Sequence, residues 1–147
     1  MKQILMRNPV GDDINNCTII SLSLAAGIPY KKANEIGIKA GREKNKGFYL
    51  EPLYEKARQK GIQIKKIPVD KGTTLKQFIS DFPIGRFVVS KYAHAFCIIN
   101  GRVHDTINNG MNSKIEEAYR FDVDTQSQLK KYYRDHYFYW HYKKREK

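Results

Sequence analysis

Cysteine is scarce in this chain of 147 residues, which contains only Cys17 and Cys97. Long apolar runs are also missing, since no stretch approaches the roughly 20 residues of a membrane span. The first residues, MKQILMRNPVGDD, become polar too early for a secretory signal. We therefore expect a cytoplasmic protein without a membrane partner, in which both cysteines are thiols rather than a disulfide.

Several signatures of nucleic-acid and nucleotide binding are absent as well. The sequence has no zinc-finger spacing, no Gly-rich phosphate loop and no RNP signature, and it contains neither repeats nor low-complexity segments. Acidic residues are few, with 15 Asp and Glu against 27 Lys and Arg, and the net charge is +12. A basic surface of this kind can bind nucleic acid or acidic proteins, or can simply keep the protein soluble. A nucleic-acid partner stays open but is not favoured.

The chain has the composition of a folded protein, with 41% apolar residues. Its length suits one domain covering residues 1–147 and is enough to bury a core. After a polar lead-in over residues 1–16, the run Cys17–Ala26 follows two good N-cap residues, Asn15 and Asn16, and stops at Gly27. This run is apolar nearly all round and predicts a buried helix. Two more helices are predicted over residues 30–40 and 50–60, each ended by a glycine.

The second half of the sequence has the pattern of strands. A short helix capped by Thr73 or Thr74 and running through Asp81 interrupts them. Residues 114–121 fit a strand or a helix. The strands are predicted over residues 62–69, 85–90, 94–100, 102–106 and 137–142, with a helix over 126–135 and a basic tail over 143–147. Helices followed by strands predict an α+β fold, in which the Cys17 helix packs on a C-terminal antiparallel sheet.

The dipeptide Asn100-Gly101 sets the register of a hairpin in this region. With a two-residue loop, Cys97 lies opposite His104. Because side chains alternate between the two faces of a strand, His94 and Asp105 become diagonal neighbours on one face. A carboxylate in that place can hold an imidazole in one tautomer and support its charged form.

Cys17 falls in the first turn of its helix, where the helix dipole favours a thiolate. A nearby imidazolium would lower the thiol pKa further, if the helix packs against the face of the hairpin that carries His94. The backbone N–H of Cys17 is then a candidate oxyanion donor. Asn15 and Asn16 are the nearest side-chain candidates for a second donor, with Asn8 further upstream, and the sequence does not choose among them.

Other interpretations of the same residues exist. Cys17 could be an ordinary core cysteine, and Cys97 with His104 forms a second thiol–imidazole pair on the opposite face. Cys97 lies inside the apolar run AFCII, which favours a core position. His136 and His141 lack a second pair of ligands at a suitable spacing, so no metal site is expected.

Three segments carry a resemblance to a known family. The segments are Asn8-Pro9, residues 16–30 from Asn16-Cys17 to Pro29-Tyr30, and residues 94–106 from His94 to Asp105-Thr106. They resemble the papain-like cysteine peptidase superfamily, and more closely its small phage and prophage members. The resemblance implies Cys17 as nucleophile, His94 as general base and acid, and Asp105 as the residue that orients His94, with no cofactor. The chain departs from this pattern at Asn16, where the phage proteins often carry Asp, and Gln3 is its only glutamine before Cys17.

These observations predict a phage-encoded thiol hydrolase that acts in the host cytoplasm. It would cleave a peptide or isopeptide bond in a protein or peptide substrate, which the basic surface could help to recruit if it is acidic. An acyl transferase of transglutaminase type would use the same three residues. The other alternative is an inactive papain-like binding module for a protein or nucleic acid. Its surface would be the mixture of aromatic and basic residues over 130–145.

Overall fold

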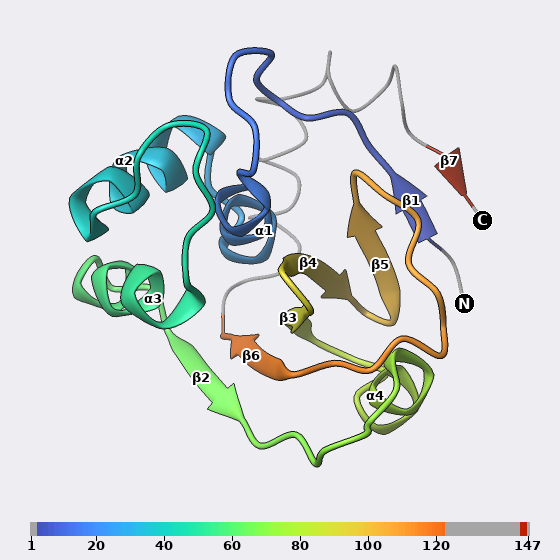
Figure 1. Cartoon of the computed structure of the whole chain (residues 1–147). Coiled ribbons are helices and arrows are strands. Elements are labelled where there is room, and N and C mark those ends of the chain that lie inside the picture. Colours follow the sequence, from blue (N-terminus) through green and yellow to red (C-terminus); the bar gives the residue numbers. More distant parts are fainter. Residues whose placement is uncertain (1–2, 123–144, 147) are drawn as a thin grey trace.

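A mixed β-sheet runs through the molecule, with helices on both of its faces (Figure 1). The computed structural model describes residues 3–122 and 145–146. The strands follow the order β2-β6-β3-β4-β5-β1-β7. Only β1 and β5 pair in parallel, and the other neighbours are antiparallel. The strands are β1 (Gln3–Leu5), β2 (Ile64–Ile67), β3 (Arg86–Lys91), β4 (His94–Ile99), β5 (Arg102–Asp105), β6 (Glu117–Phe121) and β7 (Arg145–Glu146).

The described residues form four helices, close to the predicted ranges. They are α1 (Cys17–Ala26), α2 (Tyr30–Ala40), α3 (Leu50–Gln59) and α4 (Leu75–Asp81). Gly27 and Gly41 end α1 and α2 at φ 68 and φ 110, a conformation that glycine adopts without strain. Of the two predicted caps of α4, Thr74 is the one used, and it forms a capping box with Gln77. None of the described helices is long and apolar enough to cross a membrane.

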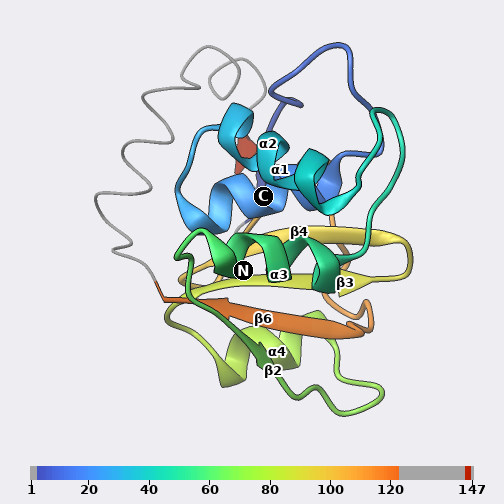
Figure 2. The same cartoon turned by 90° about the vertical axis from the view of Figure 1, so that its left-hand side faces the viewer.

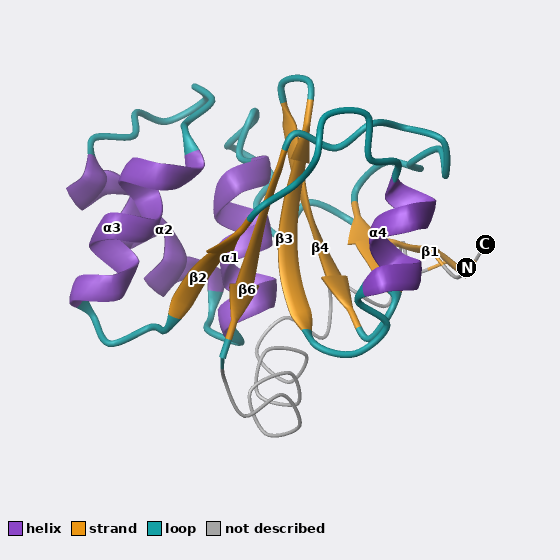
Figure 3. Cartoon of the chain, turned by 90° about the horizontal axis from the view of Figure 1, so that it is seen from below, coloured by secondary structure: helices purple, strands orange, loops and turns teal. Residues whose placement is uncertain are grey.

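Side chains on the two faces of β4 belong to two separate cores. Ala95, Cys97 and Ile99 pack into the core formed with α1, α2 and α3. Phe96 and Ile98 point to the other face, where they join the core under α4. Figure 2 and Figure 3 show this division, with α1, α2 and α3 on one side of the sheet and α4 on the other. The alternation fixes which β4 residues can face α1.

The prediction of an antiparallel sheet built from C-terminal strands is wrong at the two ends of the chain. Residues Gln3–Leu5, predicted as part of a polar lead-in, form β1, which pairs in parallel with β5. The strand predicted over residues 62–69 is confirmed as β2. Three residues are too few to show a strand pattern, and the partner of β1 lies about a hundred residues along the chain. Arg145–Glu146, predicted as tail, pairs with β1 as β7. The ambiguous segment 114–121 contains strand β6, whereas the predicted helix 126–135 and strand 137–142 lie outside the described residues.

Candidate functional site

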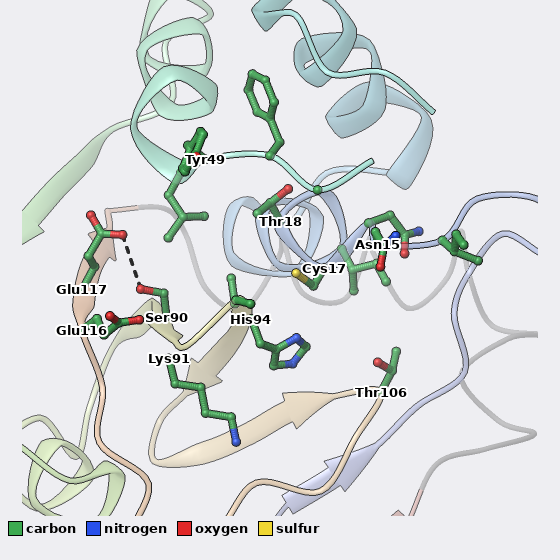
Figure 4. A pocket seen from close by; sticks show the side chains of 18 of the residues that line it. Asn15, Cys17, Thr18, Tyr49, Ser90, Lys91, His94, Thr106, Glu116 and Glu117 are labelled. Atoms are coloured by element: carbon green, nitrogen blue, oxygen red, sulfur yellow. Dashed lines mark hydrogen bonds between the residues drawn. The ribbon is translucent and has the colours of Figure 1, made fainter. Parts of the chain in front are cut away.

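Cys17, the first residue of α1, and His94, the first residue of β4, lie close together where strand β4 begins. Cys17 lies close enough to His94 and to the backbone N–H of Ala95 for both to lower the pKa of its thiol. Figure 4 shows the Cys17 side chain beside the imidazole of His94. Both cysteines are free thiols, but Cys17 is partly exposed whereas Cys97 is buried. The structure thus brings together the thiol and the imidazole that the sequence singled out.

Asp105 completes the group from the end of β5. Nε2 of His94 lies 2.6 Å from Oδ2 of Asp105, which leaves Nδ1 as the ring nitrogen that can serve the thiol. The predicted register is confirmed, since Cys97 pairs with His104 and Ile99 with Arg102. The turn residues Asn100 and Gly101 have φ 48 and φ 77, as a two-residue hairpin loop of this type requires. Cys17, His94 and Asp105 therefore form one continuous line of contacts.

The packing that brings Cys17 close to His94 differs from the predicted packing. We expected α1 to pack against the face of the hairpin that carries His94. Helix α1 packs instead on the opposite face, against Ala95 and Cys97. His94 stays on the α4 side, with its ring stacked at 6.0 Å from that of Phe96. Contact is still made because each residue is the first of its element, so the two side chains meet past the end of the strand.

The electrostatics of the pair favour a thiolate and an imidazolium. Burial alone would raise the pKa of the Cys17 thiol, but the polar interactions of the thiolate with His94 and with the backbone N–H of Ala95 outweigh burial, and the pKa is lowered from 9.0. Burial alone would lower the pKa of His94, but Asp105 and Cys17 outweigh that effect and raise it to about 9. The thiol of Cys17 therefore loses its proton at a pH where the imidazole of His94 is still protonated. This arrangement gives a reactive nucleophile and a proton donor together.

The candidate oxyanion asparagines are engaged elsewhere. Both amide hydrogens of Asn16 are used, one by Oδ1 of Asn8 at 3.1 Å and one by the hydroxyl of Tyr30 at 2.9 Å. Asn16 occupies the N-cap position of α1 without the side-chain cap bond that we expected there. Asn15 is exposed and donates to the carbonyl of Asn45 at 3.0 Å. Asn8 donates to Asp13 and Asn16. The backbone N–H of Cys17, which has no acceptor within its own helix, is the donor best placed beside the thiol.

An ion pair that the sequence did not reveal anchors the loop before Cys17. Arg42 donates two hydrogen bonds to the carboxylate of Asp13, at 2.8 and 2.9 Å, and both residues are buried. The backbone N–H of Asn45 donates to the same carboxylate at 2.9 Å, and the hydroxyl of Tyr30 lies 3.3 Å from it. This cluster ties the residues just ahead of α1 to α2 and to the segment that follows it.

A cleft of about 800 Å³ opens in front of Cys17 and His94. Phe48 and Tyr49 are among the residues that line it, and Tyr49 is 82% exposed. Glu116 and Glu117 also line the cleft, and Ser90 Oγ donates to Glu117 at 3.4 Å (Figure 4). A partly apolar hollow with a nucleophile and a few polar groups at its base is the common form of a small-molecule or peptide site.

The competing thiol–imidazole pair, Cys97 and His104, is buried and does not line this cleft. Cys97 is fully buried in the core, and burial raises the pKa of its thiol to about 12. His104 is also buried, at 4% exposure. Within residues 3–122 and 145–146, no group of three or more His, Cys, Asp or Glu side chains is placed to hold a metal ion. His136 and His141 lie outside the described residues.

No model of a known protein family matches the chain, and no match was found among curated proteins or solved structures.

Proposed function

We propose that this chain is a thiol hydrolase of papain-like fold, which cleaves a peptide or isopeptide bond through an acyl-enzyme on Cys17. The observation that carries the proposal is the line of contacts from Cys17 through His94 to Asp105, set at the base of a cleft. The resemblance of residues 16–30 and 94–106 to small phage and prophage peptidases supports a phage origin and action in a host cytoplasm, as part of the same proposal.

Each group has a role in the two halves of the reaction. The thiolate of Cys17 attacks the carbonyl carbon, and the helix N–H of Cys17 donates to the oxygen that becomes negative. The imidazolium of His94 gives its proton to the leaving nitrogen, the C–N bond breaks, and a thioester remains. Neutral His94 then takes a proton from water, whose oxygen attacks the thioester. The products are a carboxylic acid and the regenerated pair, and Asp105 holds the imidazole throughout.

The charges of the protein affect the choice of substrate both at long range and inside the cleft. The net charge of +12 attracts an acidic protein from afar. Glu116 and Glu117 on the cleft wall do not favour acidic side chains close to the nucleophile. A substrate that is acidic outside the scissile region and neutral or basic near the scissile bond satisfies both conditions.

The reactivity of Cys17 between pH 4 and 9 tests the proposal. We expect iodoacetamide to modify Cys17 rapidly at pH 5–6 in the natural protein. His94→Ala should slow this modification on the order of 10²-fold, because the imidazolium that holds the thiolate is gone. Mass spectrometry of the labelled peptides separates the two thiols, and buried Cys97 serves as an internal control that stays unmodified at every pH.

The alkaline side of the profile gives a second check. Turnover, unlike alkylation, needs the proton on His94, so its rate should fall as the pH rises through about 9, where His94 loses that proton. Modification of Cys17 that rises only near the ordinary thiol pKa of about 8.5, and equally in His94→Ala, would contradict the proposal.

A further inference from the structure

A third donor reaches the carboxylate of Asp105, from a residue that the sequence did not single out. Nδ2 of Asn109 donates to Oδ2 of Asp105 at 2.7 Å, the same oxygen that faces His94 at 2.6 Å. The other oxygen, Oδ1, accepts from the backbone N–H of Thr106 at 2.7 Å. The two donors other than His94 therefore hold both ends of the carboxylate.

Asn109 is itself held firmly in place. It is 1% exposed, and its backbone N–H donates to Oε1 of Gln3 at 2.7 Å. Nε2 of Gln3 donates back to the carbonyl of Asn109. Gln3 belongs to β1, which pairs with β5, the strand that carries Asp105. The loop after β5 is thus fastened to the neighbouring strand, 106 residues away in sequence.

The orientation of the Asn109 amide follows from this arrangement. Its Oδ1 is buried and accepts no hydrogen bond from the described residues. A buried acceptor without a donor is costly, yet turning the amide over would set that oxygen against the carboxylate of Asp105. The amide is therefore aligned by its bond to Asp105, and since it carries no titrating proton, the bond persists over the whole working pH range.

We propose that Asn109, clamped by Gln3, is a positioning residue that aims Oδ2 of Asp105 at His94. This inference rests on the proposed function, because it extends the group Cys17, His94, Asp105 by one further member. Without the Asn109 amide, His94 would be the only described residue bound to Oδ2, and the carboxylate and the imidazole could shift together. The Asn109 amide prevents this, and so keeps the imidazole in the orientation that serves Cys17.

The titration of His94, followed by NMR, tests the role directly. Asn109→Leu keeps the size of the side chain and both backbone bonds to Gln3, but removes the donor. We expect His94 to lose its proton about tenfold more readily than in the natural protein, where its pKa is about 9, because one hydrogen bond no longer holds its acceptor. Alkylation of Cys17 at pH 5–6, where His94 keeps its proton in both proteins, should also slow, because an imidazolium turned away from the thiol stabilises the thiolate less. Asn108→Leu, the same change at an exposed neighbour, should alter neither quantity.

A second variant keeps the test decisive if Asn109→Leu does not fold. Gln3→Met removes both bonds of the clamp and leaves the Asn109 side chain in place, so it should shift the His94 titration in the same direction. A folded Asn109→Leu or Gln3→Met protein in which His94 titrates as in the natural protein would contradict this inference and leave the proposed function standing. If the natural protein shows no rapid labelling at pH 5–6, the proposed function fails instead, and the two failures stay distinguishable.

Discussion

Cys17→Ala is expected to eliminate covalent capture of substrate and to reduce cleavage by at least about 10³-fold, the scale seen when a nucleophile is removed from a hydrolase. Among the described residues that line the cleft, Cys17 carries the only thiol, and that thiol forms the acyl-enzyme in the proposed mechanism. Loss of the sulfur should therefore be close to total, whereas loss of His94 leaves a slow thiol in place.

Two measurements together report this result without a known substrate. A peptide pool prepared from a cell lysate is incubated with each protein, and new N-termini are counted by mass spectrometry. A peptide that carries an acyloxymethyl ketone, which alkylates catalytic thiols, reports covalent capture directly. Cys97→Ala is the matched control. It removes the other thiol from the core, at a cost in stability of roughly 1 kcal/mol for a small cavity, and should leave capture and cleavage unchanged.

Two specific results would contradict the assignment of Cys17 as the nucleophile. If Cys17→Ala still cleaved the pool as the natural protein does, another group would carry the reaction. If capture disappeared in Cys97→Ala and persisted in Cys17→Ala, the second thiol–imidazole pair would be the reactive one. The burial of Cys97 and the pKa of about 12 for its thiol argue against that outcome.

The parts of the site that the sequence predicted are those set by short-range rules. Asn100-Gly101 fixed the hairpin register, and with it the pairing of Cys97 with His104 that brings Asp105 near His94. The glycine after residue 26 ended α1, and a helix start at Cys17 followed from the apolar run. Each of these features is decided within a few residues of chain, where turn geometry and side-chain alternation leave few options.

The parts that the sequence missed depend on contacts between distant residues. Strand β1 exists because β5 lies beside it, and the bond between Gln3 and Asn109 joins residues 106 positions apart. Asn16 was expected to cap α1 through its side chain, but the amide of Asn8 and the hydroxyl of Tyr30 engage it instead. The face of β4 that α1 covers was also predicted wrongly. Local pattern cannot show which helix covers which face, since both faces of β4 are apolar.

Asp13→Ala is expected to lower the free energy of unfolding by about 3–5 kcal/mol, the usual cost of removing one partner of a buried ion pair. The guanidinium of Arg42 would be left buried without its carboxylate, and the backbone N–H of Asn45 would lose its acceptor. Urea unfolding at pH 7 measures the effect. Asp12→Ala is the matched control, because Asp12 is the adjacent residue and its ion pair with Lys44 is exposed on both sides, so its loss should be scarcely detectable.

The pH dependence of this effect has a definite sign. The hydrogen bonds from Arg42 lower the pKa of Asp13 in the folded protein below its ordinary value of 3.8. Stability from this pair is therefore fully present above the ordinary pKa and is lost as the pH falls through the lowered one. The difference in stability between Asp13→Ala and the natural protein should shrink in acid below that range. A difference that stays constant down to pH 2 would mean that the carboxylate contributes through packing rather than charge.

Because the Asp13 cluster anchors the loop that leads into Cys17, a folded Asp13→Ala protein should also show slower alkylation of Cys17 at pH 5–6. That result would connect the stability of the loop with the reactivity of the thiol.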